Sequence, residues 1–265
     1  MSKITFRLNL GPWGHRALAA IYLAGQVVVH LLRGKINRRN TIEQMMIVGP
    51  ESLLIVLLTA SFVGMVFTIQ VAREFIAFGA PNVVGGLLAV TLTRELGPVL
   101  TAVVVAGRVG SAFAAEIGTM KVTEQIDALY MLKTDPVDYL VIPRVIACAV
   151  MMPILTLLCL IAAILGGLLI AVNLYDISQN MFIDSVHEFL NIWDLCSGLA
   201  KSMVFGALIA VIGTSWGLTT AGGAKGVGQS TTTAVVTTLI SIFIFNFFLS
   251  WAMFQGVGGA MMEGF

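Results

Sequence analysis

Charged residues are scarce in this sequence. They make up 11% of its 265 residues, whereas hydrophobic residues make up 58% and the mean hydropathy is +0.95. A soluble domain has about a quarter charged residues, so long uncharged runs between short polar stretches indicate a protein that crosses a membrane several times. The net charge of +1, with no basic stripe, argues against nucleic acid as a partner.

Cysteine and histidine are also rare, with three of each. Cys148, Cys159 and Cys196 lie in or beside apolar runs and show no CxxC or metal-ligand spacing. We therefore interpret them as small buried hydrophobic residues. The histidines are scattered along the chain. The sequence predicts neither a metal site nor a catalytic triad, and it indicates no cofactor.

Five predominantly apolar runs are long enough to cross a membrane, and they predict an all-α integral membrane protein. They occupy residues 52–72, 83–107, 145–175, 201–225 and part of 226–262. Pro153 and the Gly166-Gly167 pair in the third run predict a tilt, a kink or a break. We expect an N-terminal tail with one helix (residues 1–40) followed by a five-helix domain (residues 41–265).

The apolar segment near the N-terminus is too short for a typical span. Only residues 17–32 are free of charge, and a basic cluster follows them, whereas a spanning helix needs about 20 residues. We expect an amphipathic helix that lies in the membrane interface, with Trp13 and Tyr22 at the depth of the headgroups. A true spanning helix is the alternative.

The distribution of Lys and Arg predicts the orientation. These residues gather before the first span, after the second and after the fourth: Arg33, Lys35, Arg38, Arg39, Arg108, Lys121, Lys133, Arg144 and Lys225. The connection 176–194 contains none. The positive-inside rule then places the N-terminus in the cytoplasm and the C-terminus outside. We expect the inner membrane of a bacterium, with a plastid inner envelope as the alternative.

The stretch 115–131 is the most informative polar segment. On a helical wheel it has an apolar face of Val122, Ile126, Leu129 and Tyr130, opposite a face that carries Glu116, Met120, Glu124 and Asp127. This pattern predicts one helix lying flat on the membrane. It is either an ordinary amphipathic connection or a docking helix for a cytoplasmic partner, since an apolar anchor with a charged rim suits a transient interface.

Arg94 and Glu95 lie side by side near the middle of the second apolar run. An ionisable residue inside a membrane usually faces the bundle interior or a wet cavity. The two side chains point about 100° apart, so each needs a partner elsewhere. We expect Arg94 to meet an anionic headgroup, and Glu95 to help hold it or to pair with Lys201. The alternative is an ion pair that only fixes helix packing. Pro98, four residues after Arg94, has no N–H. The backbone carbonyl of Arg94 therefore lacks the hydrogen-bond donor that a regular helix would provide.

The glycine-rich stretch GGAKGVGQSTTT, residues 222–233, has some likeness to a phosphate-binding loop. The Walker spacing GxxxxGK[ST] is absent, because Gly226 follows Lys225. The sequence therefore predicts that the chain does not bind ATP, and we interpret this stretch as a flexible cytoplasmic loop that leads into the fifth span.

The segment RELGPVLTAVVVAGRVGSAFAAEIGTMKVTEQIDAL, residues 94–129, resembles the signature region of the MlaE-type permeases. These are membrane subunits of ABC transporters that move lipids with MCE-domain partners, and they include a chloroplast permease for galactolipid precursors. The similarity continues through FVGMVFTIQ at 62–70, the Asp135-Pro136 pair and AKSMVF at 200–205.

The resemblance implies a non-catalytic permease subunit. It implies a homodimer, two copies of a separate ATPase, a ring of MCE-domain subunits and membrane lipid as the substrate. Arg94, Glu95 and Lys201 match polar positions of the lipid cavity, and Phe67, Phe78 and Leu96 match apolar ones. The ATPase-docking positions match Glu116, Met120, Glu124 and Asp127. Asn246 stands where some relatives carry an acid, which weakens an ionic network at that point.

Two other classes of function are compatible with a polytopic chain. An intramembrane lipid-modifying enzyme would need a catalytic motif, and HExxH and GxSxG are absent. A self-sufficient secondary transporter usually shows inverted repeats, and we find none here.

Overall fold

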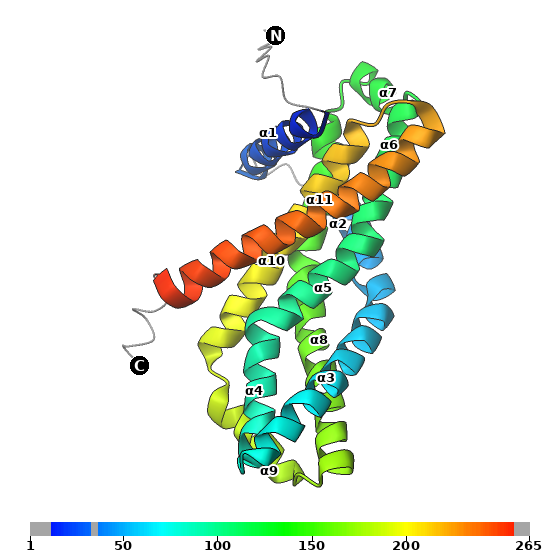
Figure 1. Cartoon of the computed structure of the whole chain (residues 1–265). Helices are drawn as coiled ribbons and strands as arrows, with labels where there is room; N and C mark the ends of the chain where they lie inside the picture. Colours follow the sequence, from blue (N-terminus) through cyan, green and yellow to red (C-terminus); the bar gives the residue numbers. More distant parts are fainter. Residues whose placement is uncertain (1–11, 33–36, 257–265) are drawn as a thin grey trace.

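The computed structural model describes residues 12–32 and 37–256, and within them it contains helices and no strand. Five helical stretches are long and apolar enough to cross a membrane: Arg38–Ala77, Pro81–Val122, Val137–Tyr175, Ile192–Leu218 and Gly223–Phe254. They pack into an elongated bundle (Figure 1). The predicted all-α membrane fold with five spans is confirmed.

The elements follow one another as α1 (Pro12–Leu32), α2 (Arg38–Val48), α3 (Pro50–Ala77), η1 (Pro81–Val83), α4 (Val84–Thr91), η2 (Leu92–Leu96), α5 (Gly97–Val105), η3 (Ala106–Gly110) and α6 (Ser111–Val122). After these come α7 (Gln125–Met131), η4 (Val137–Val141), α8 (Ile142–Tyr175), α9 (Gln179–Phe189), α10 (Ile192–Leu218), α11 (Gly223–Trp251) and η5 (Ala252–Gly256). The third span is one helix through Pro153, so the sequence-predicted break does not occur there.

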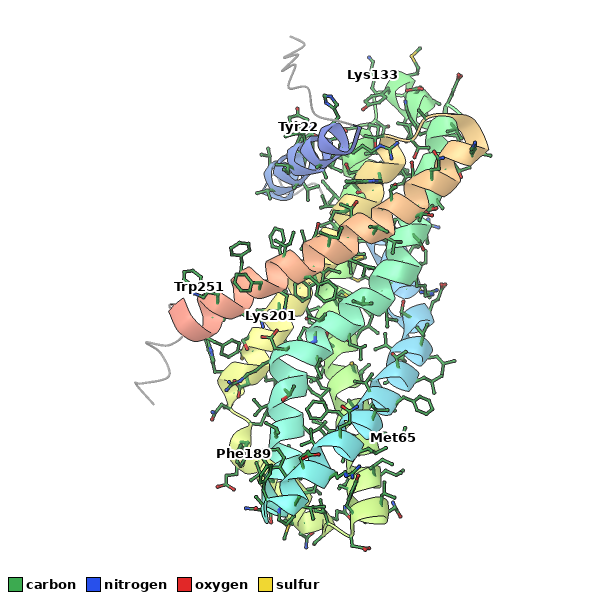
Figure 2. The ribbon with its side chains drawn as sticks, viewed as in Figure 1. Tyr22, Met65, Lys133, Phe189, Lys201 and Trp251 are labelled. Carbon is green, nitrogen blue, oxygen red and sulfur yellow. The ribbon has the colours of Figure 1, made fainter. Side chains whose placement is uncertain are left out.

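Helix α1 lies beside the bundle and is not one of the five crossing stretches (Figure 1). Its residues Ala20, Leu23 and Val27 are buried, whereas Tyr22 is 70% exposed, as its outward position in Figure 2 shows. An apolar stripe on one side and exposed residues on the other suit a helix at an interface. That location stays a prediction, and the side chain of Trp13 and the basic residues 33–35 lie outside the described part.

The helix that contains the second predicted span does not end near Gly107. It continues as one helical stretch of 42 residues, from Pro81 to Val122. At 1.5 Å per residue this is about 63 Å, roughly twice the thickness of the hydrocarbon core. The helix is therefore longer than a hydrocarbon core requires, and Arg94 lies in its first third.

The predicted single helix over residues 115–131 is wrong. Helix α6 ends at Val122, and α7 begins at Gln125 after Glu124 adopts a left-handed conformation with φ of 62°. This turn separates Val122 from Ile126, so the two do not share a helical face. Ile126 instead packs with Ile117 of α6 and Leu140, and Met120 is half-buried against them. The exposed apolar side chains of this region are Tyr130, Met131 and Leu132.

Helices α10 and α11 both begin earlier than the predicted spans. Since α10 begins at Ile192, Lys201 lies inside the helix and is fully buried, not at its boundary. Since α11 begins at Gly223, the glycine-rich stretch is a helix start and not a flexible loop. Gly222 and Gly223 have φ of 90° and 65°, which glycine adopts without a steric penalty, so they form the turn between the two helices.

Helices α3 and α8 approach each other at small residues. A Cβ at Gly64 of α3 would collide with the backbone carbonyl of Ala163, and one at Gly166 of α8 would lie 2.5 Å from the carbonyl oxygen of Ser61. Glycine at both positions lets the two backbones touch, which is how spanning helices associate in lipid.

We expect Gly64→Ala to lower the free energy of unfolding by about 1–3 kcal/mol, because the new methyl group meets backbone that cannot rotate away. Gly107→Ala is the matched control, since a Cβ there meets nothing within 4 Å. It should be neutral or slightly stabilising, because alanine favours a helix by up to about 1 kcal/mol. Thermal unfolding of both variants in detergent makes the comparison, and equal stability would contradict this packing.

Candidate substrate site

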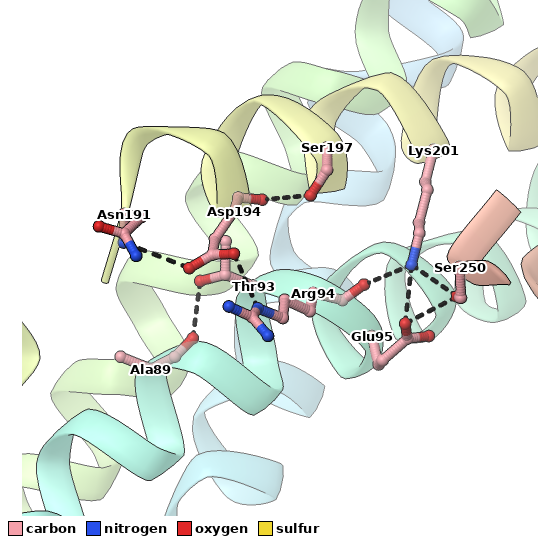
Figure 3. Close-up of polar contacts among 9 residues, drawn as sticks. All are labelled: Ala89, Thr93, Arg94, Glu95, Asn191, Asp194, Ser197, Lys201 and Ser250. Atoms are coloured by element: carbon pink, nitrogen blue, oxygen red, sulfur yellow. Dashed lines mark hydrogen bonds and ion pairs between the residues drawn. The ribbon is translucent and has the colours of Figure 1, made fainter. Parts of the chain in front are cut away.

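A charge network joins three of the spans inside the bundle (Figure 3). The ammonium group of the fully buried Lys201 in α10 donates to Glu95 Oε1, to Ser250 Oγ of α11 and to the backbone oxygen of Arg94, each at 2.8 Å. All three of its donors are therefore used, which a buried ammonium group requires. The predicted pairing of Glu95 with Lys201 is confirmed.

Pro98 makes one of these acceptors available. Proline has no N–H to donate to the carbonyl four residues before it, which belongs to Arg94. The chain responds with a π-helical turn in η2, where Gly97 donates to the carbonyl of Leu92 five residues earlier. π-Turns of this kind occur often at functional sites. The carbonyl of Arg94 is then free to accept from Lys201.

Arg94 has a partner that sequence reasoning missed. Its Nε donates to Asp194 Oδ1 at 2.7 Å, and Asp194 is fully buried. The prediction that Asp194 belongs to the connection 176–194 is wrong, because it occupies the first turn of α10. There its second oxygen accepts from the backbone N–H of Asn191, the helix cap, at 3.2 Å. The spacing from Asn191 to Asp194 is that of a capping box, the signal that could have located this helix start.

Each ion pair has one buried member and one that reaches the surface. Arg94 is 33% exposed against 0% for Asp194, and Glu95 is 38% exposed against 0% for Lys201. The ring of Phe254 lies under both cations, 4.9 Å from the guanidinium carbon of Arg94 and 5.3 Å from Lys201 Nζ. The surface of the network thus presents the cation Arg94 beside the anion Glu95. The two positive and two negative charges of the network sum to zero.

Asn246 completes the shell around Glu95. Its amide nitrogen donates to Glu95 Oε2 at 2.7 Å, and Ser250 Oγ lies 2.7 Å from Oε1. Both oxygens of this carboxylate are therefore hydrogen-bonded by α11. A neutral amide at this position supports Glu95 without adding a second negative charge beside it.

The predicted apolar cavity residues are not gathered at this network. Leu96 is half-buried in η2 and packs on the core. Phe67 is half-buried in the same core but belongs to α3. Phe78 is 80% exposed, at the C-terminal cap of α3. No polar or aromatic contact of the network, among the described residues, involves Phe67 or Phe78.

The four predicted docking residues lie around the α6–α7 turn, and two of them form intrachain ion pairs. Glu116 accepts from Arg144 of α8 at 2.7 Å, and the Arg144 side chain is only 5% exposed. Asp127 pairs with Lys121 at 3.2 Å across the turn. Glu124 is the left-handed residue between the helices. Glu116 thus joins α6 to α8, and Asp127 joins α7 to α6.

One histidine is less isolated than the sequence suggests. His30 of α1 contacts Asp138 of η4, and together with Asp135 their ligand atoms lie within 4.8 Å of one another, a group that could hold a metal ion. Asp135 Oδ1 accepts from the backbone N–H of Val137 at 2.9 Å. We interpret this cluster as a contact that fixes α1 against the start of α8, since each side chain in it has a partner in the protein.

We expect Lys201→Met to lower the free energy of unfolding by about 3 kcal/mol, because it leaves Glu95 charged without its cation. The double variant Lys201→Met/Glu95→Gln should recover at least about 1 kcal/mol, since it removes both charges. Lys121→Met, which breaks an exposed pair, is the control and should cost less than about 1 kcal/mol. Additive losses in the double variant, measured by thermal unfolding, would show that the pair is not coupled.

Comparison with known proteins places the chain among transporter permeases. The sequence profile of the family described as Permease MlaE matches residues 41–252. A probable ABC transporter permease protein of Synechocystis sp. is 66% identical over 97% of this chain and 98% of its own. The chloroplastic protein TRIGALACTOSYLDIACYLGLYCEROL 1 of Arabidopsis thaliana is 53% identical over 93% of this chain and 70% of its own. A probable ABC transporter permease protein of Rickettsia bellii is 40% identical over 96% of both chains. The chain belongs to the MlaE permease family.

Proposed function

We propose that this chain is the permease subunit of an ABC transporter that moves lipid, with the ATP hydrolysed by a separate partner chain. Membership of the MlaE permease family supports the transporter class, and the name of the Arabidopsis thaliana relative refers to a galactolipid. The observation that carries the proposal is the charge network. Four ionised side chains inside a membrane bundle are costly, and two of them reach the surface where a substrate could meet them.

The exposed edge of this network suits a polar lipid headgroup. Arg94 uses Nε for Asp194, and the two terminal nitrogens of its guanidinium fork can bind the oxygens of a phosphate. Glu95 stands next to it and can accept from a hydroxyl or ammonium group of the same headgroup. The exposed aromatic side chains of α11, among them Phe243 and Phe247, can then contact the acyl chains.

The buried members of the pairs give the network a second possible role. Asp194 and Lys201 are fully enclosed, so the ion pairs also fix the register of α10 against the second span. If this were their only role, lipid binding would not depend on the exposed edge of Arg94. The two roles are therefore separable by experiment.

The ATPase partner fits the end of the bundle that holds α7. The positive-inside rule predicts this end to be cytoplasmic, and Lys133 and Phe189 mark the two opposite ends in Figure 2. Here Tyr130, Met131 and Leu132 are 60%, 85% and 74% exposed. An apolar cluster rimmed by acids such as Glu124 suits a protein interface. In this arrangement a homodimer binds two ATPase copies, and the ring of MCE-domain subunits meets the opposite, α9 end.

We expect Arg94→Gln to lose bound phospholipid at the network, because glutamine cannot form the charged fork. Native mass spectrometry of the gently extracted assembly, co-expressed with its candidate partners, compares lipid occupancy with that of the wild type. Arg73→Gln, an exposed arginine of α3, is the matched control. An unchanged lipid at unchanged occupancy in Arg94→Gln would assign the arginine to packing alone.

We expect Met131→Asp to weaken co-purification of the ATPase partner by at least about tenfold, since a charge replaces an apolar contact near the centre of the interface. At 85% exposure the change should leave thermal unfolding of the chain unaltered. Met181→Asp, on α9 at the opposite end, is the control. ATPase recovery equal to that of the wild type would exclude this cluster as the docking surface, and Met120→Asp then tests the neighbouring α6 position.

A further inference from the structure

A second polar site lies away from the charge network, in a groove between α1, α10 and α11. The groove has a volume of about 660 Å³. Arg16 of α1 and the buried Trp216 of α10 line it together with one face of α11. Figure 1 shows α1 lying beside the bundle, and its packing partner there is chiefly α10. The groove is therefore built from segments that are about 200 residues apart in the chain.

The α11 side of the groove is a single helical face. It consists of Lys225, Gly228, Gln229, Thr232 and Thr233, which follow the i, i+3, i+4, i+7 and i+8 spacing of one face. No side chain fills the space over Gly228, where a Cβ would meet nothing within 4 Å. A ligand can therefore approach the helix there beside the amide of Gln229, whereas the hydroxyl groups of Thr232 and Thr233 donate to backbone carbonyls of α11.

The charge of the groove is positive and unbalanced. Arg16 is half-buried and Lys225 is exposed, and neither forms an ion pair with any carboxylate that the structure describes. This distinguishes the groove from the charge network, where every cation has an acid within 2.8 Å. Two cations converging on one cavity favour an anion, and a guanidinium with an ammonium group is a common pairing for phosphate.

We propose that this groove binds a phosphate group, carried by a lipid headgroup or free in solution. Its position beside α1, the helix predicted to lie in the membrane interface, places it at the depth of lipid phosphates. Seventeen residues of α11 separate Gln229 from Asn246, which corresponds to about 25 Å along the helix. The groove is therefore a separate site at the other end of α11, and its binding does not depend on the proposed transport.

The test is a titration of the delipidated full chain with dioleoyl phosphatidic acid, followed by native mass spectrometry. Arg16→Gln/Lys225→Gln should bind the lipid at least about tenfold more weakly than the wild type, since both charged contacts to the phosphate are lost. The control is Arg73→Gln/Lys133→Gln, which removes the same two charges from exposed positions elsewhere. Dioleoylglycerol, which lacks the phosphate, should be insensitive to both double variants. Unchanged phosphatidic acid binding in the groove variant would overturn the proposal.

Two further experiments, one with a variant that fills the groove and one with a competing ligand, locate the site and identify what it binds. Gly228→Leu fills the groove without changing its charge and should also weaken phosphatidic acid binding. Normal binding in that variant would mean that the cations act only through long-range attraction, which would overturn the groove site. Competition by inorganic phosphate would assign the recognition to the phosphate alone, whereas its failure would assign it to the lipid headgroup. Binding at the charge network is lost in Arg94→Gln and kept in the groove variant, so the two proposals fail independently.

Discussion

The burial of the Lys201 ammonium group is the constraint on which the centre of the structure depends. Removing an ammonium ion from water costs several kcal/mol unless acceptors surround it. Lys201 has no exposed surface, and its three acceptors come from the second span and from α11. The second, fourth and fifth spans must therefore meet at one level. A shift of any of them by a helical turn would leave the ammonium group or Glu95 without a partner.

Pro98 and the π-helical turn are part of the same constraint. In a regular helix the carbonyl of Arg94 would accept from the residue four positions later, and Lys201 would lack one acceptor. Pro98 has no N–H and so does not compete with Lys201 for this carbonyl. In the wider π-helical turn, the N–H of Gly97 donates to the carbonyl of Leu92 instead. Adjacent helical side chains point about 100° apart. The partners of residues 94 and 95 consequently come from two different directions, Asp194 for one and Lys201 with α11 for the other.

The sequence was sufficient for the number of spans, because the cost of charge in an apolar medium leaves long uncharged stretches in a membrane protein. It gave the Glu95–Lys201 pair as one of two alternatives, and the structure selects the pair. It was not sufficient for Asp194, which belongs to an acidic stretch without Lys or Arg and is buried because α10 begins at Ile192, nine residues before the predicted fourth span. The end of the helix at Glu124 was also missed, since a left-handed residue does not change the hydrophobic pattern of the sequence around it. The extension of the second span through α6 was missed because charge density indicates where a bilayer ends and not where a helix ends. The convergence of Arg16 with Lys225 is tertiary, and no local pattern in the chain predicts it.

The balance of charge at the network bears on the kind of headgroup it would accept under the proposed function. Arg94 and Lys201 are neutralised within the protein by Asp194 and Glu95, so the site as a whole exerts little net attraction on an anion. Its exposed surface is a cation beside an anion, which matches a headgroup that carries both a phosphate and a donor. Asn246 preserves this balance, because an acid there would place two carboxylates against one ammonium group. The groove at the other end of α11 has two cations without described acids, and so it selects for negative charge.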